Sequence, residues 1–476
     1  MSKKIRYIVF TAVCFAMCVA PFAGMLFART NSTTENKKMA QMPKIKNEDG
    51  SWNTGFLGGL GTYYEDHFAF RPYLVMADSV IQSKVFGVSN VDSVIYGQNG
   101  WLYYKSTLDD YLGQNLMSDR ALFNGAHNLA LMQQYVTSRG ADFLVTVPPN
   151  KNSLYGENMP YYYGRKVSSR KNIDGFEKQM EREQVSYLDL FTLFEDRDEI
   201  LYLERDSHWN NDGAVMVYNA IMDTLDLEHD TMENVDVSRS RDEIGDLNRM
   251  LYPVAQEPEW NTTYLFEQGF GYTDDRVKGV EDAVIETFCA DGSGSMLMFR
   301  DSFGNTLLPL VANAVENGAF YKTLPYDIEG LMEKHKPDVV VVEKVERNLR
   351  EFAESPPVMT GLEVTLGQTE EEETETTVQM QSSQTNALYN EICGAIEEAC
   401  VEENSRVYVR IVQEHSEKTY EAFTVSNETT DYGYLLYLPK ADLEDGGLTA
   451  YVYVQNGDRA ICVQSQDFII QENEIR

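Results

Sequence analysis

Between residues 121 and 342, short apolar runs alternate with stretches of helical spacing, and this alternation limits the fold more than any other feature of the sequence. Residues 122–138 have helical spacing and end at Gly140, a common helix stop, and the apolar run 142–147 follows them. A similar succession recurs farther along the chain. Residues 338–342 contain four consecutive valines, a composition suited to a strand that is buried on both faces. Strands that alternate with helices predict an α/β domain with a largely parallel sheet.

The alternation lies within an α/β domain that we expect at residues 51–352, and the chain changes character after it. Residues 353–388 are rich in Glu, Ser, Thr and Gln and hold few apolar residues, so we expect an acidic, disordered linker or a long loop there. Residues 389–476 contain runs of strand composition separated by turns such as the Asn-Gly pair at 456–457. They predict a small C-terminal β-sandwich module.

Residues 1–28 predict a membrane segment. Basic residues at 3–6 precede the uncharged span 7–28, which is long enough to cross a bilayer as a helix. The expected arrangement is a single-pass anchor in the cytoplasmic membrane, with a polar linker at 29–50 and the bulk of the chain outside the cytoplasm. A signal peptide cleaved at the small residue that ends the span is the alternative.

Composition excludes some partners and cofactors. The formal net charge of −35 argues against nucleic acid, because binding to phosphate backbones needs basic patches. No Cys-x-x-Cys pair occurs and the six histidines are scattered, so neither a zinc site nor another cofactor is expected.

Cys393, Cys400 and Cys462 share the C-terminal part. One disulfide among them, most simply Cys393–Cys400, and three reduced thiols are both consistent with the sequence.

Two short segments, 206–210 and 299–304, contain the parts of a nucleophilic acyl-transfer site: a hydroxyl, an imidazole and a carboxylate. Ser302 follows an apolar run and precedes a helix-like stretch, where the backbone N–H groups that open a helix can stabilise an oxyanion. Asp206 precedes His208 by two residues, so both side chains project to one side of an extended segment. The competing interpretation is that Ser302 only caps a helix and His208 is satisfied in a loop.

Five motifs occur in a fixed order over residues 50–350. They are Tyr-Glu-Asp-His-Phe-Ala-Phe-Arg at 64–71, Gly-Trp-Leu-Tyr at 100–103, Val-Pro-Pro-Asn-Lys at 147–151, Asp-Ser-His-Trp at 206–209 and Arg-Asp-Ser-Phe-Gly at 300–304. With these motifs the chain resembles the DHHW family of exported bacterial proteins. More broadly, it is similar to the SGNH-hydrolase-like proteins that O-acetylate alginate and other exopolysaccharides.

The resemblance implies an SGNH-hydrolase-like domain: a flavodoxin-like, three-layer fold that is permuted, because here the Asp-His pair precedes the serine. It also implies a triad in which Ser302 is the nucleophile, His208 the base and Asp206 the residue that orients the base. Two departures bear on the site. Ser207 replaces the first histidine of the family's name motif, and Arg300 stands where ordinary SGNH hydrolases carry glycine.

A Gly-x-Asn-Asp block, which supplies an oxyanion donor in ordinary SGNH enzymes, is also missing from the sequence. Besides the Ser302 N–H, we expect Asn150 to be the second oxyanion donor. The candidates for substrate binding or for the oxyanion pocket are Asn150, Lys151, Arg300 and Trp209.

These features together predict an extracytoplasmic, serine-dependent O-acyl (acetyl) transferase or esterase that acts on a cell-envelope or secreted polysaccharide. As the resemblance implies, a multispanning membrane O-acyltransferase is the expected source of the acetyl group. The alternative from another class is a non-catalytic glycan-binding or scaffold protein of the cell envelope that uses the same fold.

Overall fold

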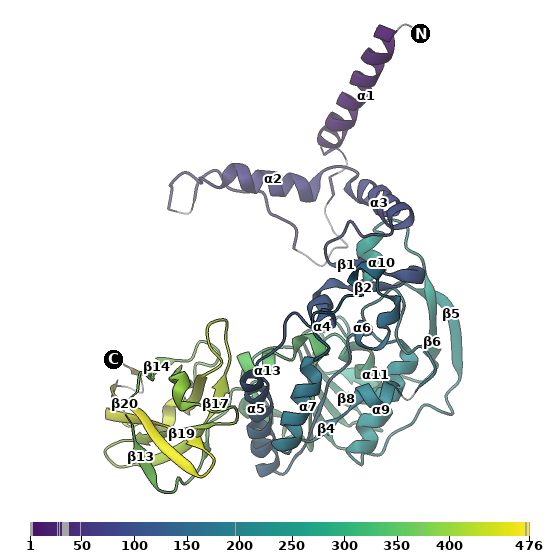
Figure 1. Ribbon diagram of the computed structural model, residues 1–476. Helices are drawn as coiled ribbons and strands as arrows, with labels where there is room; N and C mark the ends of the chain where they lie inside the picture. Colours follow the sequence, from purple (N-terminus) through teal and green to yellow (C-terminus); the bar gives the residue numbers. More distant parts are fainter. Residues whose placement is uncertain are drawn as a thin grey trace.

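A computed structural model describes the chain except for residues 1–2, 26, 28, 31–37, 48, 196, 373, 472–473 and 476 (Figure 1). The alternative signal-peptide cleavage position at residue 28 and residues 31–37 and 48 of the expected 29–50 linker therefore lie outside the described residues. The described chain forms an N-terminal group of helices, an α/β domain and a C-terminal β module (Figure 1).

The α/β domain is built on a seven-stranded sheet with the strand order β4-β3-β11-β9-β10-β8-β7. The first five of these strands run parallel to their neighbours, and β8 and β7 extend one edge in antiparallel fashion. The strands are β3 (Asp142–Thr146), β4 (Tyr187–Leu188), β7 (Phe270–Tyr272), β8 (Val284–Cys289), β9 (Ser295–Phe299), β10 (Asn317–Tyr321) and β11 (Val339–Glu343). The largely parallel sheet that the alternation predicts is confirmed.

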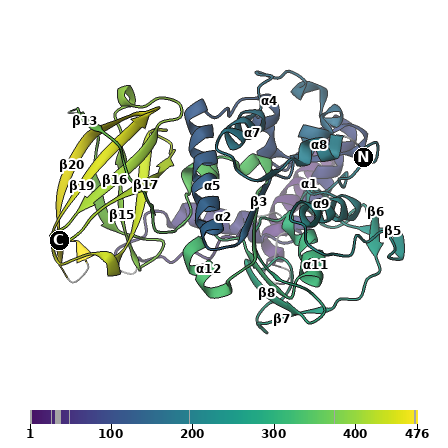
Figure 2. The ribbon, with the colours of Figure 1, turned by 90° about the horizontal axis from the view of Figure 1, so that it is seen from below.

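Helices cover both faces of this sheet, because successive strand residues point to opposite faces. Val340 and Val342 of β11 belong to one apolar core, and Val339 and Val341 belong to another. All four valines are buried, as their composition predicts. The first core includes α5 (Asp119–Ser138), α7 (Asn172–Arg182) and α12 (Ile328–His335), and the second includes α8 (Leu190–Glu195), α9 (Asn211–Thr224) and α11 (Gly304–Ala314). The domain is therefore a three-layer structure (Figure 2).

The N-terminal helices stand away from the sheet (Figure 1). They are α1 (Lys3–Gly24), α2 (Phe56–His67) and α3 (Arg71–Ile81). Among the described residues, α1 alone is long and apolar enough to cross a membrane. Below α3, a small layer consists of the hairpin β1 (Val94–Tyr96) and β2 (Leu102–Tyr104) and the helix α10 (Asp246–Leu251). A second hairpin, β5 (Val237–Glu243) and β6 (Glu259–Tyr264), lies at the side of the domain (Figure 1).

The C-terminal module is strand-rich, as expected. Its strands are hydrogen-bonded in the order β13-β20-β19-β16-β17-β18-β15-β14 around a core of their own, with β12 and β21 on side branches. They are β12 (Leu362–Glu363), β13 (Thr369–Glu371), β14 (Gln379–Ser382), β15 (Tyr389–Ala395), β16 (Arg406–Val412), β17 (Glu417–Val425), β18 (Gly433–Pro439), β19 (Gly446–Asn456), β20 (Arg459–Gln471) and β21 (Glu474–Ile475). All six cysteines of the chain lie in the described residues and are free thiols, so the Cys393–Cys400 disulfide is not formed.

The segment 353–388 differs from the expected linker, because it contributes three strands to the module. β12 pairs with β17, β13 with β20 and β14 with β15. Its low apolar content has a physical reason: the residues of β13 are all exposed, and in β14 only Met380 is buried. Backbone hydrogen bonds rather than apolar burial hold such edge strands, so composition does not reveal them.

The module docks on α5. Asn128 of α5 donates from Nδ2 to the carbonyl oxygens of Phe352 and Thr424 at 3.0 and 2.9 Å. The neighbouring His127 lies between Glu183 of the α/β domain (Nδ1 to Oε2, 2.8 Å) and Glu421 of β17 (Nε2 to Oε1, 3.3 Å). Buried polar contacts therefore tie the two parts together.

Candidate active site

The turn after β9 is fixed by Asp301. One carboxylate oxygen accepts from the Phe303 N–H at 2.8 Å, and the other accepts from the Val345 N–H at 2.9 Å, beyond the end of β11. The Asp301 N–H in turn donates to Glu343 Oε2 at 3.0 Å. Because Asp301 caps the turn, the Ser302 hydroxyl is not needed for this purpose.

Ser302 instead meets His208, and His208 meets Asp206. Ser302 Oγ lies 2.8 Å from His208 Nε2, and His208 Nδ1 lies 2.7 Å from Asp206 Oδ1. The His208 side chain is 22% exposed, so this chain of groups opens to solvent at the imidazole. The structure thus brings together the three residues that the sequence singled out, at the carboxyl end of a parallel strand, where ligand sites of such sheets collect.

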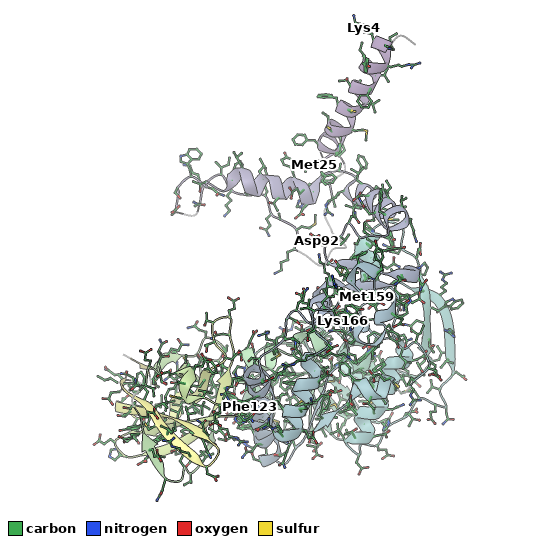
Figure 3. All side chains as sticks on the ribbon, viewed as in Figure 1. Lys4, Met25, Asp92, Phe123, Met159 and Lys166 are labelled. Atoms are coloured by element: carbon green, nitrogen blue, oxygen red, sulfur yellow. The ribbon has the colours of Figure 1, made fainter. Side chains whose placement is uncertain are left out.

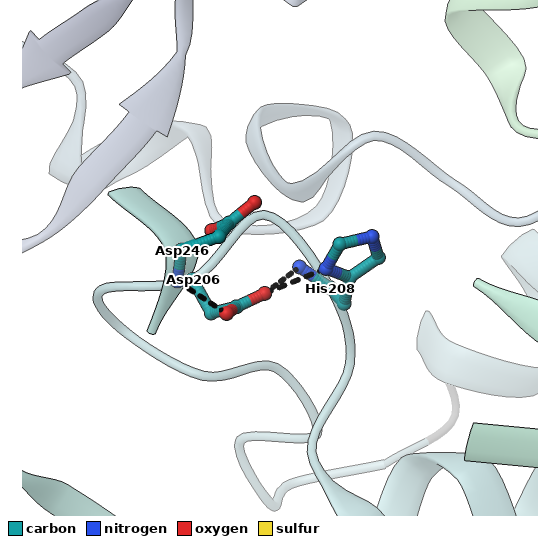
Figure 4. A group of neighbouring side chains, drawn as sticks. All are labelled: Asp206, His208 and Asp246. Atoms are coloured by element: carbon teal, nitrogen blue, oxygen red, sulfur yellow. Dashed lines mark hydrogen bonds and ion pairs between the residues drawn. The ribbon is translucent and has the colours of Figure 1, made fainter. Parts of the chain in front are cut away.

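Asp246 supports the Asp206 carboxylate through its main-chain N–H (Figure 4). The Asp246 N–H donates to Asp206 Oδ2 at 2.7 Å, while the His208 N–H donates to Oδ1 at 2.9 Å. The Asp246 carboxylate accepts from the N–H and the hydroxyl of Ser207 at 2.8 and 2.6 Å. Ser207, which departs from the family motif, therefore anchors the loop to α10. Asp246 was missed because no local pattern joins it to residue 206, forty positions earlier.

The charges of the site favour a charged Asp206 and a basic His208. Burial opposes ionisation of Asp206, but the charge and hydrogen bond of His208 outweigh it, so the pKa of Asp206 is well below its ordinary value. Burial also lowers the pKa of His208, but the charges of Asp206 and Asp246 and the hydrogen bond to Asp206 raise it overall. Since Asp206 is charged, Nδ1 of His208 carries the proton and Nε2 accepts from the Ser302 hydroxyl.

Lys151 does not have the substrate-binding geometry that we expected. Its side chain is buried, and Nζ donates to the main-chain carbonyl oxygens of Leu203 and Glu204 at 3.0 Å each and of Asp206 at 2.5 Å. Burial lowers the pKa of Lys151 to about 8 against the opposing charge of Asp206. With all three donors used, Lys151 shapes the loop that leads into His208.

Arg300 is also a buried support. Its Nη1 donates to Asn305 Oδ1 at 2.5 Å, and its Nη2 donates to the carbonyl oxygens of Val280 and Asp282 at 2.9 and 3.1 Å. The guanidinium therefore joins the start of α11 to the loop before β8. A glycine could not make these contacts, so the departure at position 300 has a structural explanation.

Asn150 and Trp209 point into the protein as well. The Asn150 N–H donates to Glu346 Oε2 at 2.8 Å, and its Nδ2 lies 3.4 Å from Asp110 Oδ2, so the expected second oxyanion donor is engaged elsewhere. Trp209 is 1% exposed and donates from Nε1 to Thr306 Oγ1 at 2.6 Å. Its ring stiffens the core beneath His208 rather than lining a substrate site.

Arg347 is the cation that sequence reasoning missed. It lies in η6 (Glu346–Asn348), just beyond the end of β11, the neighbour of β9. Its guanidinium stacks over the rings of Tyr104 and Phe303 at 5.5 and 5.8 Å, and within the described part of the chain it makes no hydrogen bond or ion pair. The Ser302 N–H likewise has no acceptor among the described residues. Both are available to a substrate oxygen.

Asp206, His208 and Asp246 carry ligand-type atoms that lie within 4.8 Å of one another, a spacing that a metal ion could use. Each of these side chains is already engaged, however. His208 Nδ1 bonds Asp206, and both oxygens of Asp246 accept from Ser207. A bound metal ion would have to break the contact that orients the imidazole, so the donor set suits hydrogen bonding better than metal binding.

Comparison with known proteins defines the class. Residues 94–283 match the family model described as SGNH hydrolase-like domain, acetyltransferase AlgX. The match includes Asp206 and His208 and ends before Ser302. Comparison with curated proteins finds no significant match. The chain therefore contains an SGNH-hydrolase-like domain, and the resemblance drawn from its motifs is confirmed.

Several solved structures are similar to the chain at low identity. Bacillus cereus PatB1 is 16% identical, over 54% of this chain and 96% of that one, with a TM-score of 0.45. A DHHW family protein from Eubacterium siraeum is 15% identical, over 54% and 93%, with a TM-score of 0.41. The O-acetyltransferase domain of Pseudomonas putida AlgJ is 14% identical, over 54% and 92%, with a TM-score of 0.38. At this level the likeness concerns the fold alone.

Proposed function

We propose that this protein is an extracytoplasmic, serine-dependent O-acetyltransferase or esterase that acts on a cell-envelope or secreted polysaccharide. The observation that carries the proposal is the continuous contact from Ser302 Oγ through His208 to Asp206, at 2.8 and 2.7 Å. The family model matched by residues 94–283 describes an acetyltransferase domain and supports the same chemistry.

In the proposed reaction, Ser302 Oγ attacks the carbonyl carbon of an acetyl ester and His208 Nε2 takes the hydroxyl proton. Charged Asp206 stabilises the imidazolium that forms. The Ser302 N–H and the Arg347 guanidinium are available to the developing oxyanion. His208 then returns the proton to the leaving alcohol, and an acetyl-serine remains. A sugar hydroxyl attacks that ester while His208 Nε2 takes its proton, and His208 then gives the proton to Ser302 Oγ as the ester bond to serine breaks, which leaves the acetylated glycan and free Ser302. Water in place of the sugar gives esterase activity.

The proposed location is the outer face of the cytoplasmic membrane, with α1 as a single-pass anchor. Its length, its apolar composition and its basic first turn support this arrangement. An acetyl donor outside the cytoplasm has to be supplied across the membrane, so a multispanning membrane O-acyltransferase is the partner we propose.

A serine-reactive probe and a chromogenic acetyl ester test the function. The wild-type protein should be labelled at Ser302, as mapped by mass spectrometry, and should release acetate, and Ser302→Ala should do neither. Ser293→Ala, in a loop on the amino-terminal side of β9, is the matched control and should behave as wild type. A folded wild type that is never labelled and never turns over acetyl donors would instead favour a glycan-binding or scaffold protein.

A further inference from the structure

Helix α3 and the π-helical turn that continues it, η1 (Gln82–Phe86), bury polar side chains against the α/β domain. Ser79 and Ser83 are 0% and 2% exposed. Ser79 Oγ donates to Asn90 Oδ1 at 2.8 Å, and the Tyr252 hydroxyl donates to Ser83 Oγ at 2.8 Å. A surface helix of a soluble domain usually buries its apolar face and exposes its polar one. Here the face of α3 and η1 that packs against the α/β domain includes buried hydroxyl groups.

The opposite face of α3 is apolar and exposed. Phe70, Leu74, Ile81 and Val85 follow one another along it: Phe70 lies just before α3, Leu74 and Ile81 lie seven residues apart on one face of α3, and Val85 lies in η1. They are 52%, 49%, 51% and 72% exposed. Contiguous apolar surface of this kind is uncommon on soluble proteins and marks an interaction site.

Helix α2 repeats this arrangement. It buries Asp66, whose Oδ2 accepts from the Ala40 N–H at 2.7 Å, and it exposes Leu57 to 78%. Trp52, just before α2, is 71% exposed. In both helices, therefore, a polar side chain is buried and an apolar side chain is exposed.

The elbow between α2 and α3 is packed against the last turn of α1. The Ala69 N–H donates to the Pro21 carbonyl at 3.2 Å, and the rings of Phe22 and Tyr64 stack at 4.9 Å. A side chain on Gly24 would place its Cβ 2.7 Å from that of Ala69, so the approach needs glycine. Figure 3 shows Met25 at this junction and Lys4 at the distant end of α1. In Figure 1, α2 lies across the direction of α1.

We propose that α2, α3 and η1 (residues 56–86) form an interfacial platform whose apolar side chains insert into the outer surface of the bilayer that α1 spans. The inference rests on the anchor that is part of the proposed function. At about 1.5 Å per residue, the 22 residues of α1 span about 33 Å, close to the hydrocarbon thickness of a bilayer. The last turn of α1, and with it the elbow, then lies at the membrane surface, where helices with one apolar face bind in the plane of the membrane.

Photo-crosslinking tests the platform in the full-length protein, reconstituted in vesicles of phosphatidylethanolamine and phosphatidylglycerol. p-Benzoylphenylalanine replaces Val85 on the platform or, as the matched control, Val167 on the α/β domain. The two valines are equally exposed, at 72% and 71%. Irradiation should give lipid adducts at position 85 at about tenfold the yield found at position 167.

Each outcome separates this inference from the functional proposal. Equal lipid yields at the two positions, or adducts at position 85 mainly to a second copy of the chain, would overturn the platform. Protein that is washed from the vesicles at high salt would instead refute the anchor. Acetyl-ester turnover, which is measured separately, tests the catalytic proposal independently of both.

Discussion

The main-chain N–H of Asp246 donates to Asp206 Oδ2 at 2.7 Å, so the carboxylate that orients His208 is itself held by the first turn of α10. The Asp246 carboxylate binds Ser207 and lies within 4.8 Å of a His208 ring nitrogen without a hydrogen bond to it. Asp246 therefore acts on the imidazole in two separable ways, through its backbone and through its charge.

Asp246→Asn keeps the backbone contact and removes the charge. Because the charge of Asp246 helps to raise the pKa of His208, we expect the acid limb of the pH–rate profile to move to lower pH in this variant. Asp246→Ala also removes the hydrogen bonds to Ser207 and should lower the plateau rate about tenfold, or ~1.4 kcal/mol. Exposed Asp242→Asn is the control, and an unchanged limb in Asp246→Asn would contradict the electrostatic role.

The three proposed catalytic residues should behave as a unit. Ser302→Ala and His208→Ala should each lower acetyl-ester turnover about 10⁴-fold, and the double variant should lose little more than either one. Asp206→Asn should retain some activity, because it disturbs the orientation of the base without removing it. Steady-state kinetics on purified protein measure all four variants. Multiplicative losses in the double variant would mean that Ser302 and His208 act independently.

The predictable parts of the fold are those in which side-chain chemistry repeats along the chain. The buried valines of β11 and the helical spacing of α5 follow from periodicity, and the sheet follows from their alternation. The edge strands β13 and β14 do not follow from periodicity, since they are held mainly by backbone hydrogen bonds, which leave little trace in the side-chain pattern.

The same distinction applies to the site. The proposed catalytic groups have a recognisable sequence pattern, because acyl chemistry needs a hydroxyl, an imidazole and a carboxylate. The supporting residues have no such pattern. Lys151 was expected to bind substrate but donates to three main-chain carbonyl oxygens of the loop before His208. Asp246 and Arg347 come from segments that are distant in the sequence. Which basic side chain faces solvent depends on tertiary packing.

Gly245 should be essential for the position of Asp246. A Cβ at this residue would lie 2.3 Å from the Arg205 carbonyl oxygen and 2.8 Å from the Asp206 nitrogen, so Gly245→Ala has to push α10 away from the loop that carries Asp206. We expect a loss of about 1–3 kcal/mol in the free energy of unfolding, as for other overpacked sites, and a clear fall in kcat. Gly271→Ala, where nothing lies within 4 Å, is the control for an added methyl group. Wild-type kcat in Gly245→Ala would show that the loop tolerates this shift.

His127 should make the docking of the β module sensitive to pH. Burial lowers the pKa of His127, but Glu183 and Glu421 on either side outweigh burial and raise it overall, and Arg406 bonds the same two carboxylates. The folded protein therefore binds more protons than the unfolded chain between the ordinary histidine value of about 6.5 and the raised pKa. The stabilisation is complete below this window and is lost as the pH rises through it.

The measurement is the Tm from thermal unfolding at a series of pH values for wild type, His127→Gln and His415→Gln. Glutamine keeps a hydrogen-bonding group and cannot titrate, so the decline in Tm above pH 6.5 should be smaller in His127→Gln than in wild type. His415 is 75% exposed and pairs only with Glu444 among the described residues, so its replacement should leave the decline unchanged. If the Tm of His127→Gln and that of wild type fall by the same amount over this range, protonation of His127 does not cause the pH dependence. The ion pairs of Arg406 with Glu183 and Glu421 would then hold the module without it.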